Sequence, residues 1–140
     1  MSRIDDKISE ITVFLSELEE IAPSSLEAYK LSIEKRAACE RYVEKIVEGL
    51  TDLAFFAIKE KKLRVPQDDA DAFNILSENK VISSDLAARL KNAKGMRNII
   101  SHQYGRIDDE IVYEAVTGEL AKDAEKFIEA IKTPKSKAVR

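Results

Sequence analysis

Apolar side chains recur every three or four residues along most of the chain, which is the period of an amphipathic α-helix. The first such pattern predicts a helix from about Arg3 to about Ile21, which a proline ends. A second pattern starts after Ser24, where Ser24 and Glu27 have the spacing of a capping box, and it runs to about Lys61. Because that length exceeds the usual helix, the segment either bends near Gly49 or forms one long spine.

The second half of the chain predicts three further helices. Around Pro66 the chain must turn, and a short helix from Asp69 to Glu78 follows. Ser84 then fits an N-cap, and the helix that it opens should stop at Gly105. A final helix covers Asp108 to about Ile131, with its first residue as the N-cap.

These patterns predict an all-α fold, an up-and-down bundle of about five helices. We expect a single domain over residues 1–132 and a basic, mobile tail over residues 133–140. Most polar side chains of the long second pattern are expected to be solvated surface groups. The polar side chains in question are Arg36, Arg41, Tyr42, Glu44, Glu48 and Asp52.

Composition supports a globular helical protein, since 44% of residues are hydrophobic, 35% are charged, and glycine and proline are few. The single cysteine, Cys39, can form neither an internal disulfide nor a thiolate cluster, so we expect a reducing, cytoplasmic setting and no structural metal. The longest apolar run, from Leu53 to Ile58, is too short to cross a membrane, and we expect no membrane association. A net charge of -3 argues against general binding of DNA or RNA, so any contact with RNA must be local.

Positive charge is concentrated in one stretch, between Asp85 and Asp108, which contains no acidic residue. The only histidine of the chain, His102, lies in the same stretch. Its basic residues are Arg89, Lys91, Lys94, Arg97 and Arg106.

This stretch combines groups suited to phosphodiester chemistry. A guanidinium offers a planar fork of donors to phosphate, and an imidazole can transfer a proton near neutral pH. On a helix Asn98 and His102 lie about 40° apart, whereas Arg97 and His102 lie about 140° apart. Arg97 and His102 can therefore flank one small ligand only if Asn98 sits between them, or if the last turn loosens near Ser101. The alternative is structural, because cations at a helix C-terminus are favoured by the helix dipole.

The segment RNIISHQY has the pattern R-x-x-x-x-H-x-Y, within the longer string GMRNIISHQYGRIDDEIVY. It resembles the motif of the HEPN superfamily, and specifically the HepT-like toxins encoded beside a minimal nucleotidyltransferase (MNT) antitoxin. The resemblance extends from about Ile4 to Ile131.

The resemblance implies a toxin that is an endoribonuclease, metal-independent and without a cofactor. Arg97 and His102 would form its active site, with Asn98 in support. The contacts to RNA phosphates would come from Lys94, Arg106, Lys91 and Arg89.

The resemblance also implies two protein partners. RNA cleavage benefits from both a base and an acid, and the chain has one histidine, so we expect a two-fold homodimer in which the motif helices face each other. The cognate nucleotidyltransferase would neutralise the toxin by attaching AMP to Tyr104. From the residues alone, Tyr104 could equally pack against Ile107 or the final helix.

Two other functions stay open at this point. The chain could be a catalytically silent helical dimer that binds nucleotide, or that serves as the scaffold and substrate of the nucleotidyltransferase. It could also be a helical bundle without this activity, whose basic stretch only stabilises the helix through a favourable interaction with the helix dipole. RNA cleavage in the presence of a chelator separates the ribonuclease from both.

Overall fold

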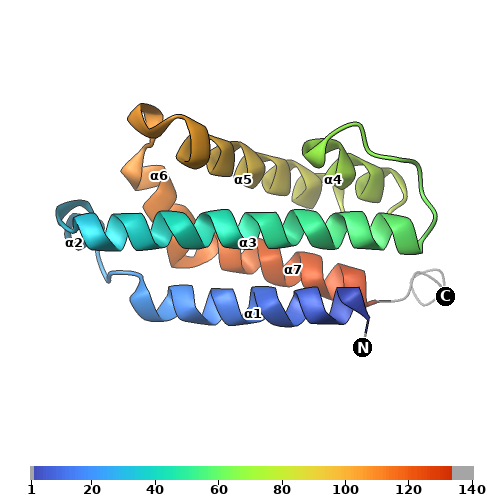
Figure 1. Cartoon of the computed structure of the whole chain (residues 1–140), viewed down its shortest axis with the longest axis horizontal. Helices are drawn as coiled ribbons and strands as arrows, with labels where there is room; N and C mark the ends of the chain where they lie inside the picture. Colours follow the sequence, from blue (N-terminus) through green and yellow to red (C-terminus); the bar gives the residue numbers. More distant parts are fainter. Residues whose placement is uncertain (1, 134–140) are drawn as a thin grey trace.

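The computed structural model describes residues 2–133, so the predicted basic tail from Pro134 onward lies outside the described residues. The described residues form helices joined by short connections, without a strand (Figure 1). Five helices have ten residues or more, which confirms the predicted all-α bundle. The elements are α1 (Arg3–Ile21), α2 (Leu26–Leu31), α3 (Ile33–Glu60), α4 (Asp69–Glu78), α5 (Ser84–His102), the 3₁₀ turn η1 (Tyr104–Arg106), α6 (Asp109–Glu114), the π-helical turn η2 (Ala115–Glu119) and α7 (Leu120–Lys132).

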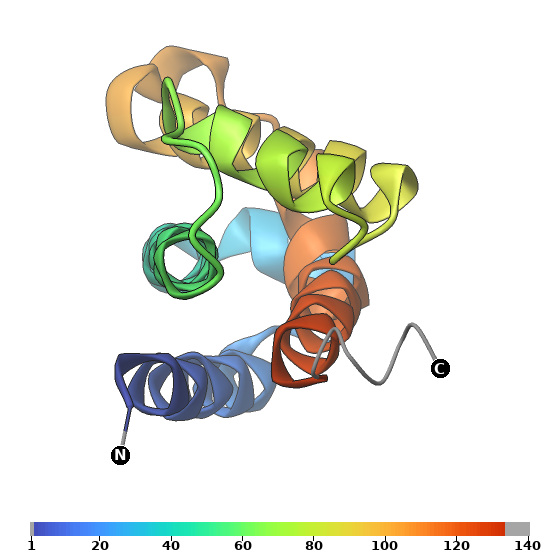
Figure 2. The same ribbon diagram turned by 90° about the vertical axis from the view of Figure 1, so that its right-hand side faces the viewer.

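The helices lie lengthwise around α3, which contacts α1, α4, α5 and α7. Seen end-on, α1 and α7 cover one side of the bundle, and α4 and α5 cover the other (Figure 2). Their apolar faces meet in one core, in which the rings of Phe73 and Phe127 lie edge to face with centroids 5.8 Å apart. Among residues 2–133, no helix combines the length and the apolar character that crossing a membrane requires.

The long second pattern forms two helices. Its larger part, α3, continues through Gly49, so the spine alternative is correct and the bend is not observed. A Cβ atom at Gly49 would lie 2.8 Å from Cγ1 of Ile11, so glycine is what lets α1 approach α3 this closely.

The predicted capping box at Ser24 is wrong by one residue. The hydroxyl of Ser25, not of Ser24, accepts the N–H of Ala28 at 3.1 Å and caps α2. The chain then leaves helical geometry at Ser32, whose hydroxyl accepts the N–H of Lys35 at 3.1 Å and starts α3. A serine hydroxyl that accepts a backbone N–H can start a new helix in this way. One stretch of apolar side chains with helical spacing can therefore form two successive helices.

Helix α5 has different ends from those predicted. Its N-cap is Ser83, whose hydroxyl accepts the N–H of Leu86 at 3.0 Å, so the choice of Ser84 is corrected by one residue. The helix stops at His102, and the N–H of Gln103 donates to the carbonyl of Ile99 at 2.8 Å. Gly105 therefore does not end the helix and lies within the turn η1.

The predicted final helix is interrupted. It does begin after the N-cap Asp108, whose carboxylate accepts the N–H groups of Glu110 and Ile111. The wider turn η2 then separates α6 from α7, and Gly118 adopts a φ of 156°, which a residue with a side chain rarely adopts. Such wide turns insert a residue into a helix and are common next to functional segments.

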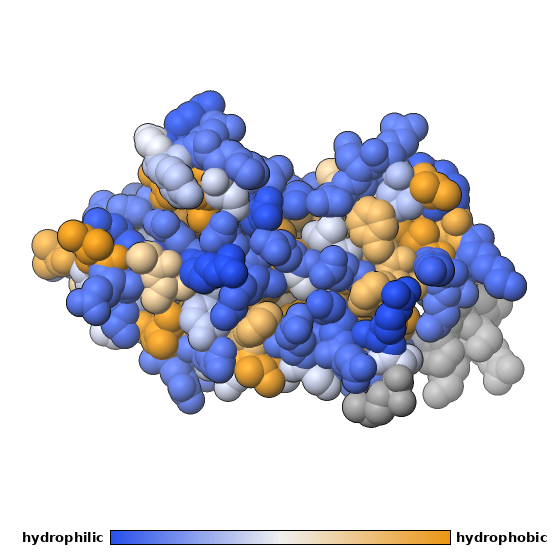
Figure 3. Space-filling model, viewed as in Figure 1, coloured by the Kyte–Doolittle hydropathy of each residue, from blue (hydrophilic) through white to orange (hydrophobic). Residues whose placement is uncertain are grey.

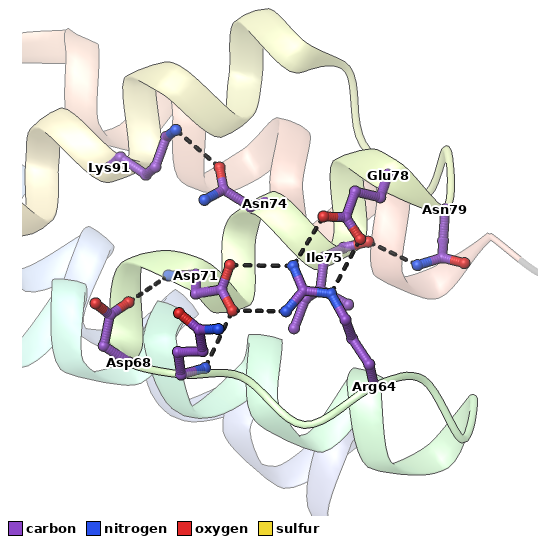
Figure 4. Close-up of polar contacts among 9 residues, drawn as sticks. Arg64, Asp68, Asp71, Asn74, Ile75, Glu78, Asn79 and Lys91 are labelled. Carbon is purple, nitrogen blue, oxygen red and sulfur yellow. Dashed lines mark hydrogen bonds and ion pairs between the residues drawn. The ribbon is translucent and has the colours of Figure 1, made fainter.

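An ion-pair cluster fixes the connection between α3 and α4 (Figure 4). Arg64 donates to both oxygens of Asp71 and to both oxygens of Glu78, at 2.8 to 3.2 Å. The guanidinium of Arg64, followed by the backbone N–H of Gln67, lowers the pKa of Asp71 to about 2. The two acids of the cluster, Asp71 and Glu78, belong to α4. The predicted bounds of α4 are confirmed, and its N-cap is Asp68.

Candidate functional site

The last turns of α5 are bound to α3 by two acids. Arg97 donates from Nη2 to Oε2 of Glu48 at 2.8 Å, and the hydroxyl of Ser101 donates to Oε2 of Glu44 at 2.5 Å. On each helix the two partners are four residues apart and therefore lie on the same face. The contact thus holds the part of α5 that carries the motif against the middle of the spine.

Glu48 and Asp52 are exposed, as expected of solvated surface charges, although Glu48 pairs with Arg97 and Asp52 pairs with Lys7 at 3.4 Å. Glu44 and Tyr42 are half-buried instead, which corrects the expectation for these two, and the hydroxyl of Tyr42 donates to Glu17 at 2.9 Å. A signal for the contact is present in the sequence, because Glu40, Glu44, Glu48 and Asp52 form an acidic stripe at four-residue spacing. Such a stripe complements a basic neighbouring helix.

Arg97 is held on several sides. Its side chain is 20% exposed, and Nη1 lies 3.4 Å from Oδ1 of the exposed Asn98. Its Nε is buried and has no hydrogen-bond partner among the described residues. The guanidinium therefore keeps donors that its ion pair with Glu48 does not use.

Lys94 is the second cation beside Arg97. It pairs with Asp69 of α4 at 3.0 Å and is 13% exposed. The two cations line a pocket of about 210 Å³ between α3, α4 and α5, together with Glu48, Asp52 and Asp69. Of the four predicted phosphate contacts, Lys94 is the one that the structure places next to Arg97.

The other predicted phosphate contacts have separate surroundings. Lys91 donates to Oδ1 of Asn74 at 2.8 Å, as Figure 4 shows. Arg89 donates to the buried Asp123 of α7 at 2.9 Å, and the carboxylate raises the pKa of Arg89. Arg106, on η1, donates to the side chain of Gln103 at 3.2 Å. The first two therefore tie α5 to neighbouring helices.

The remaining motif residues are exposed where α5 ends. His102 is the exposed last residue of the helix, and Tyr104 is 74% exposed on η1. A ring this exposed is not packed against Ile107 or the final helix, which leaves the Tyr104 hydroxyl open to other molecules. Hydrophilic residues dominate the middle of the face that Figure 3 shows, and hydrophobic residues gather at the α2 end and towards the opposite end.

Other reactive groups do not extend this site. Cys39 is buried, and burial raises the pKa of its thiol, which disfavours the thiolate. Burial likewise raises the pKa of Tyr29. Among residues 2–133, no three side chains of His, Cys, Asp or Glu gather as a metal site.

Comparison with known proteins adds a family match. A family model described as ribonuclease HepT-like matches residues 11–131, which include all of α3 and α5. An mRNA nuclease HepT of Shewanella oneidensis is 33% identical over 90 residues, 64% of this chain and 67% of the relative. A tRNA nuclease HepT of Aphanizomenon flos-aquae is 25% identical over 114 residues, 81% of this chain and 78% of the relative.

Solved structures share the fold. A tri-AMPylated HEPN toxin of Shewanella oneidensis, in complex with an MNT antitoxin, superposes with a TM-score of 0.86 and 27% identity. The superposition covers 94% of this chain and 98% of the toxin. The similarity therefore includes the helices that carry the candidate site.

Proposed function

The chain belongs to the ribonuclease HepT-like family, and from this membership we propose that it is an endoribonuclease that acts as the toxin of a toxin–antitoxin pair. The proposal is supported by the mRNA and tRNA nuclease relatives and by the likeness to a HEPN toxin in complex with its antitoxin. The observation that carries it for this chain is the fixed Arg97 guanidinium on the same helix as an exposed His102.

The chemistry that fits these groups is transfer of the phosphodiester to the neighbouring 2′-hydroxyl of the RNA. His102 takes the proton from that hydroxyl, the 2′-oxygen bonds to phosphorus, and the 5′-oxygen leaves as it receives a proton. Arg97 stabilises the charge on the crowded phosphorane with its fixed donors, and Asn98 supports Arg97. The products are a 2′,3′-cyclic phosphate and a free 5′-hydroxyl, and no metal takes part.

A two-fold homodimer completes this site. Arg97 turns towards α3, whereas His102 lies about 140° further around α5, so one chain does not bring the two side chains together. A second copy with its motif helix facing the first supplies a second histidine, which can protonate the leaving oxygen.

The same surface accounts for neutralisation. The exposed Tyr104 hydroxyl is the acceptor to which an MNT-type nucleotidyltransferase transfers AMP. An adenylate attached at the end of α5 adds negative charge and bulk beside His102. It therefore excludes RNA from the space between the two facing motif helices of the dimer.

Growth and RNA integrity test the proposal. Cells that express the wild-type chain should stop growing, and their RNA should be fragmented by the purified protein in EDTA. His102→Ala should abolish both effects, while Gln103→Ala, a change at the neighbouring exposed residue, should abolish neither. The proposal fails if His102→Ala cleaves like wild type. It also fails if unmodified wild type, verified by intact mass, leaves RNA whole, which would favour a silent binding module.

A further inference from the structure

The ion pair between Glu48 and Arg97 joins two unequally buried groups. Arg97 is 20% exposed and Glu48 is 47% exposed, with Nη2 and Oε2 2.8 Å apart. The contact with Glu48 uses Nη2, while Nη1 makes only a long contact of 3.4 Å with Oδ1 of the exposed Asn98 and can still donate to a phosphate. The pair therefore holds Arg97 without occupying the whole fork.

The guanidinium needs such a hold for two reasons. An arginine side chain has many rotamers, and it loses their entropy when it is fixed in one of them. In addition, Lys94 lies three residues before Arg97 on the same helix and in the same pocket, and like charges at this spacing repel. Asp69 pairs with Lys94, and Glu48 pairs with Arg97, so each cation has its own acid.

We propose that Glu48 is a positioning residue, which fixes the Arg97 guanidinium in the orientation that binds the phosphorane. This inference rests on the proposed ribonuclease function. Glu48 acts through Arg97 and does not itself touch the RNA. Positioning is a catalytic effect of its own, because a displacement of about 1 Å can cost roughly 100-fold in rate.

Asp52 provides the matched control. It lines the same pocket one turn further along α3 and has the same charge, but it pairs with Lys7 of α1. Glu48→Ala and Asp52→Ala therefore remove equal charge from the same pocket, and only the first removes the partner of Arg97.

The first measurement is cleavage of a mixed-sequence RNA oligonucleotide that carries a fluorophore and a quencher. Glu48→Ala should lower kcat by about tenfold or more, whereas Asp52→Ala should leave kcat near wild type. Both variants should change KM alike, since both remove a negative charge near the RNA. Glu48→Gln, which keeps an acceptor oxygen at the same length, should recover part of kcat and also serves if Glu48→Ala does not fold.

Three results would overturn the inference. Equal loss of kcat in both alanine variants would assign the effect to pocket charge. An unchanged kcat in Glu48→Ala would mean that Arg97 needs no anchor. A raised kcat would make Glu48 a competitor of the phosphate for Arg97.

A second measurement does not depend on RNA cleavage. The ¹⁵N–¹H signal of the Arg97 Nε group, assigned by its loss in Arg97→Ala, should be sharp and distinct in wild type. It should move to the position of mobile arginines in Glu48→Ala and stay in Asp52→Ala. If it stays in Glu48→Ala, the inference fails even if RNA is cleaved. If wild type cleaves no RNA, the proposed function fails, and this signal alone shows whether Glu48 orders Arg97.

Discussion

At the scale of single residues, exposure separates the tyrosine that a modifying enzyme can use from the tyrosines that hold the fold. Tyr104 is 74% exposed on a short turn, whereas Tyr29 is buried and packs against Tyr113, with ring centroids 5.4 Å apart. Tyr113 in turn donates to the carbonyl of Pro23 at 2.9 Å. A modifying enzyme can therefore reach the first hydroxyl without disturbing the bundle.

Tyr104→Phe should escape neutralisation while leaving the fold intact. We expect its stability to stay within about 0.5 kcal/mol of wild type, because the hydroxyl is exposed. Co-expressed with the cognate nucleotidyltransferase, wild type should gain the mass of AMP and Tyr104→Phe should not, as intact mass would show. Tyr42→Phe, whose hydroxyl is bonded to Glu17, is the control and should be modified like wild type. AMP on Tyr104→Phe would disprove the assignment.

The residues of the motif could be predicted from sequence, but their partners could not. The helical period alone shows that Arg97 and His102 diverge on α5, and the structure has Arg97 turned to α3. Glu48 lies 49 residues earlier in the chain, and its contact with Arg97 depends on how α3 and α5 slide past each other. No local pattern determines that register, so the sequence alone does not pair Glu48 with Arg97.

At the scale of elements, the start of α5 tests how well a cap can be assigned. Ser83 caps the helix through the N–H of Leu86, while Ser84 is its exposed first residue. Ser83→Ala should lower the free energy of unfolding by about 1 kcal/mol. Ser84→Ala should change it by less than about 0.5 kcal/mol, since alanine is a good helix former. Urea unfolding of both variants measures this, and a larger loss in Ser84→Ala would restore the cap predicted from sequence.

The connection before α4 should make stability depend on pH in the acid range. The pKa of Asp71 is about 2 in the folded chain, below its ordinary value of 3.8, because Arg64 binds its charged form. Its stabilising contribution is therefore complete above about pH 4 and is lost as the pH falls towards 2.

Asp71→Asn should lower the Tm at pH 6 and flatten the fall in Tm between pH 4 and pH 2. Thermal unfolding across that range measures both effects. Glu125→Gln, at an exposed position within α7, should keep the wild-type profile. An Asp71→Asn profile parallel to that of wild type would show that the cluster does not contribute.

Helix boundaries were predictable where a strong stop signal coincides with the end of an apolar pattern. The bounds of α1 and α4 agree with those predicted, since a proline and a turn segment follow them. The breaks at Ser32 and at η2 were not predicted, because the apolar period continues across both. At η2 the wide turn and Gly118 absorb the change of direction, and buried residues continue on both sides, from Val112 to Leu120.

At the scale of the whole molecule, the motif lies at one end of the bundle, where α5 meets η1 (Figure 1). Arg97 and Lys94 lie in the pocket beside α3, while His102 and Tyr104 are exposed at the helix end. A single chain therefore presents two half-sites on different sides of α5. Under the proposed function, we therefore expect complementary halves to come from two chains.

Mixing two inactive variants tests that expectation. Arg97→Ala and His102→Ala should each fail to cleave RNA alone, but their mixture should recover a fraction of wild-type activity. Random association makes about half of the dimers hybrid, and each hybrid unites the Arg97 of one chain with the His102 of the other. Co-expression with two different tags isolates the hybrids, and a doubly tagged His102→Ala dimer is the control and should stay inactive. Hybrids that form but do not cleave would mean either that Arg97 and His102 of the same chain act together, or that cleavage needs the second histidine, which the hybrid lacks. A hybrid of wild type with His102→Ala, which has the same single histidine, separates the two. In the first case the last turn of α5 must open and let the two side chains meet, and the contact of Ser101 with Glu44 would oppose catalysis.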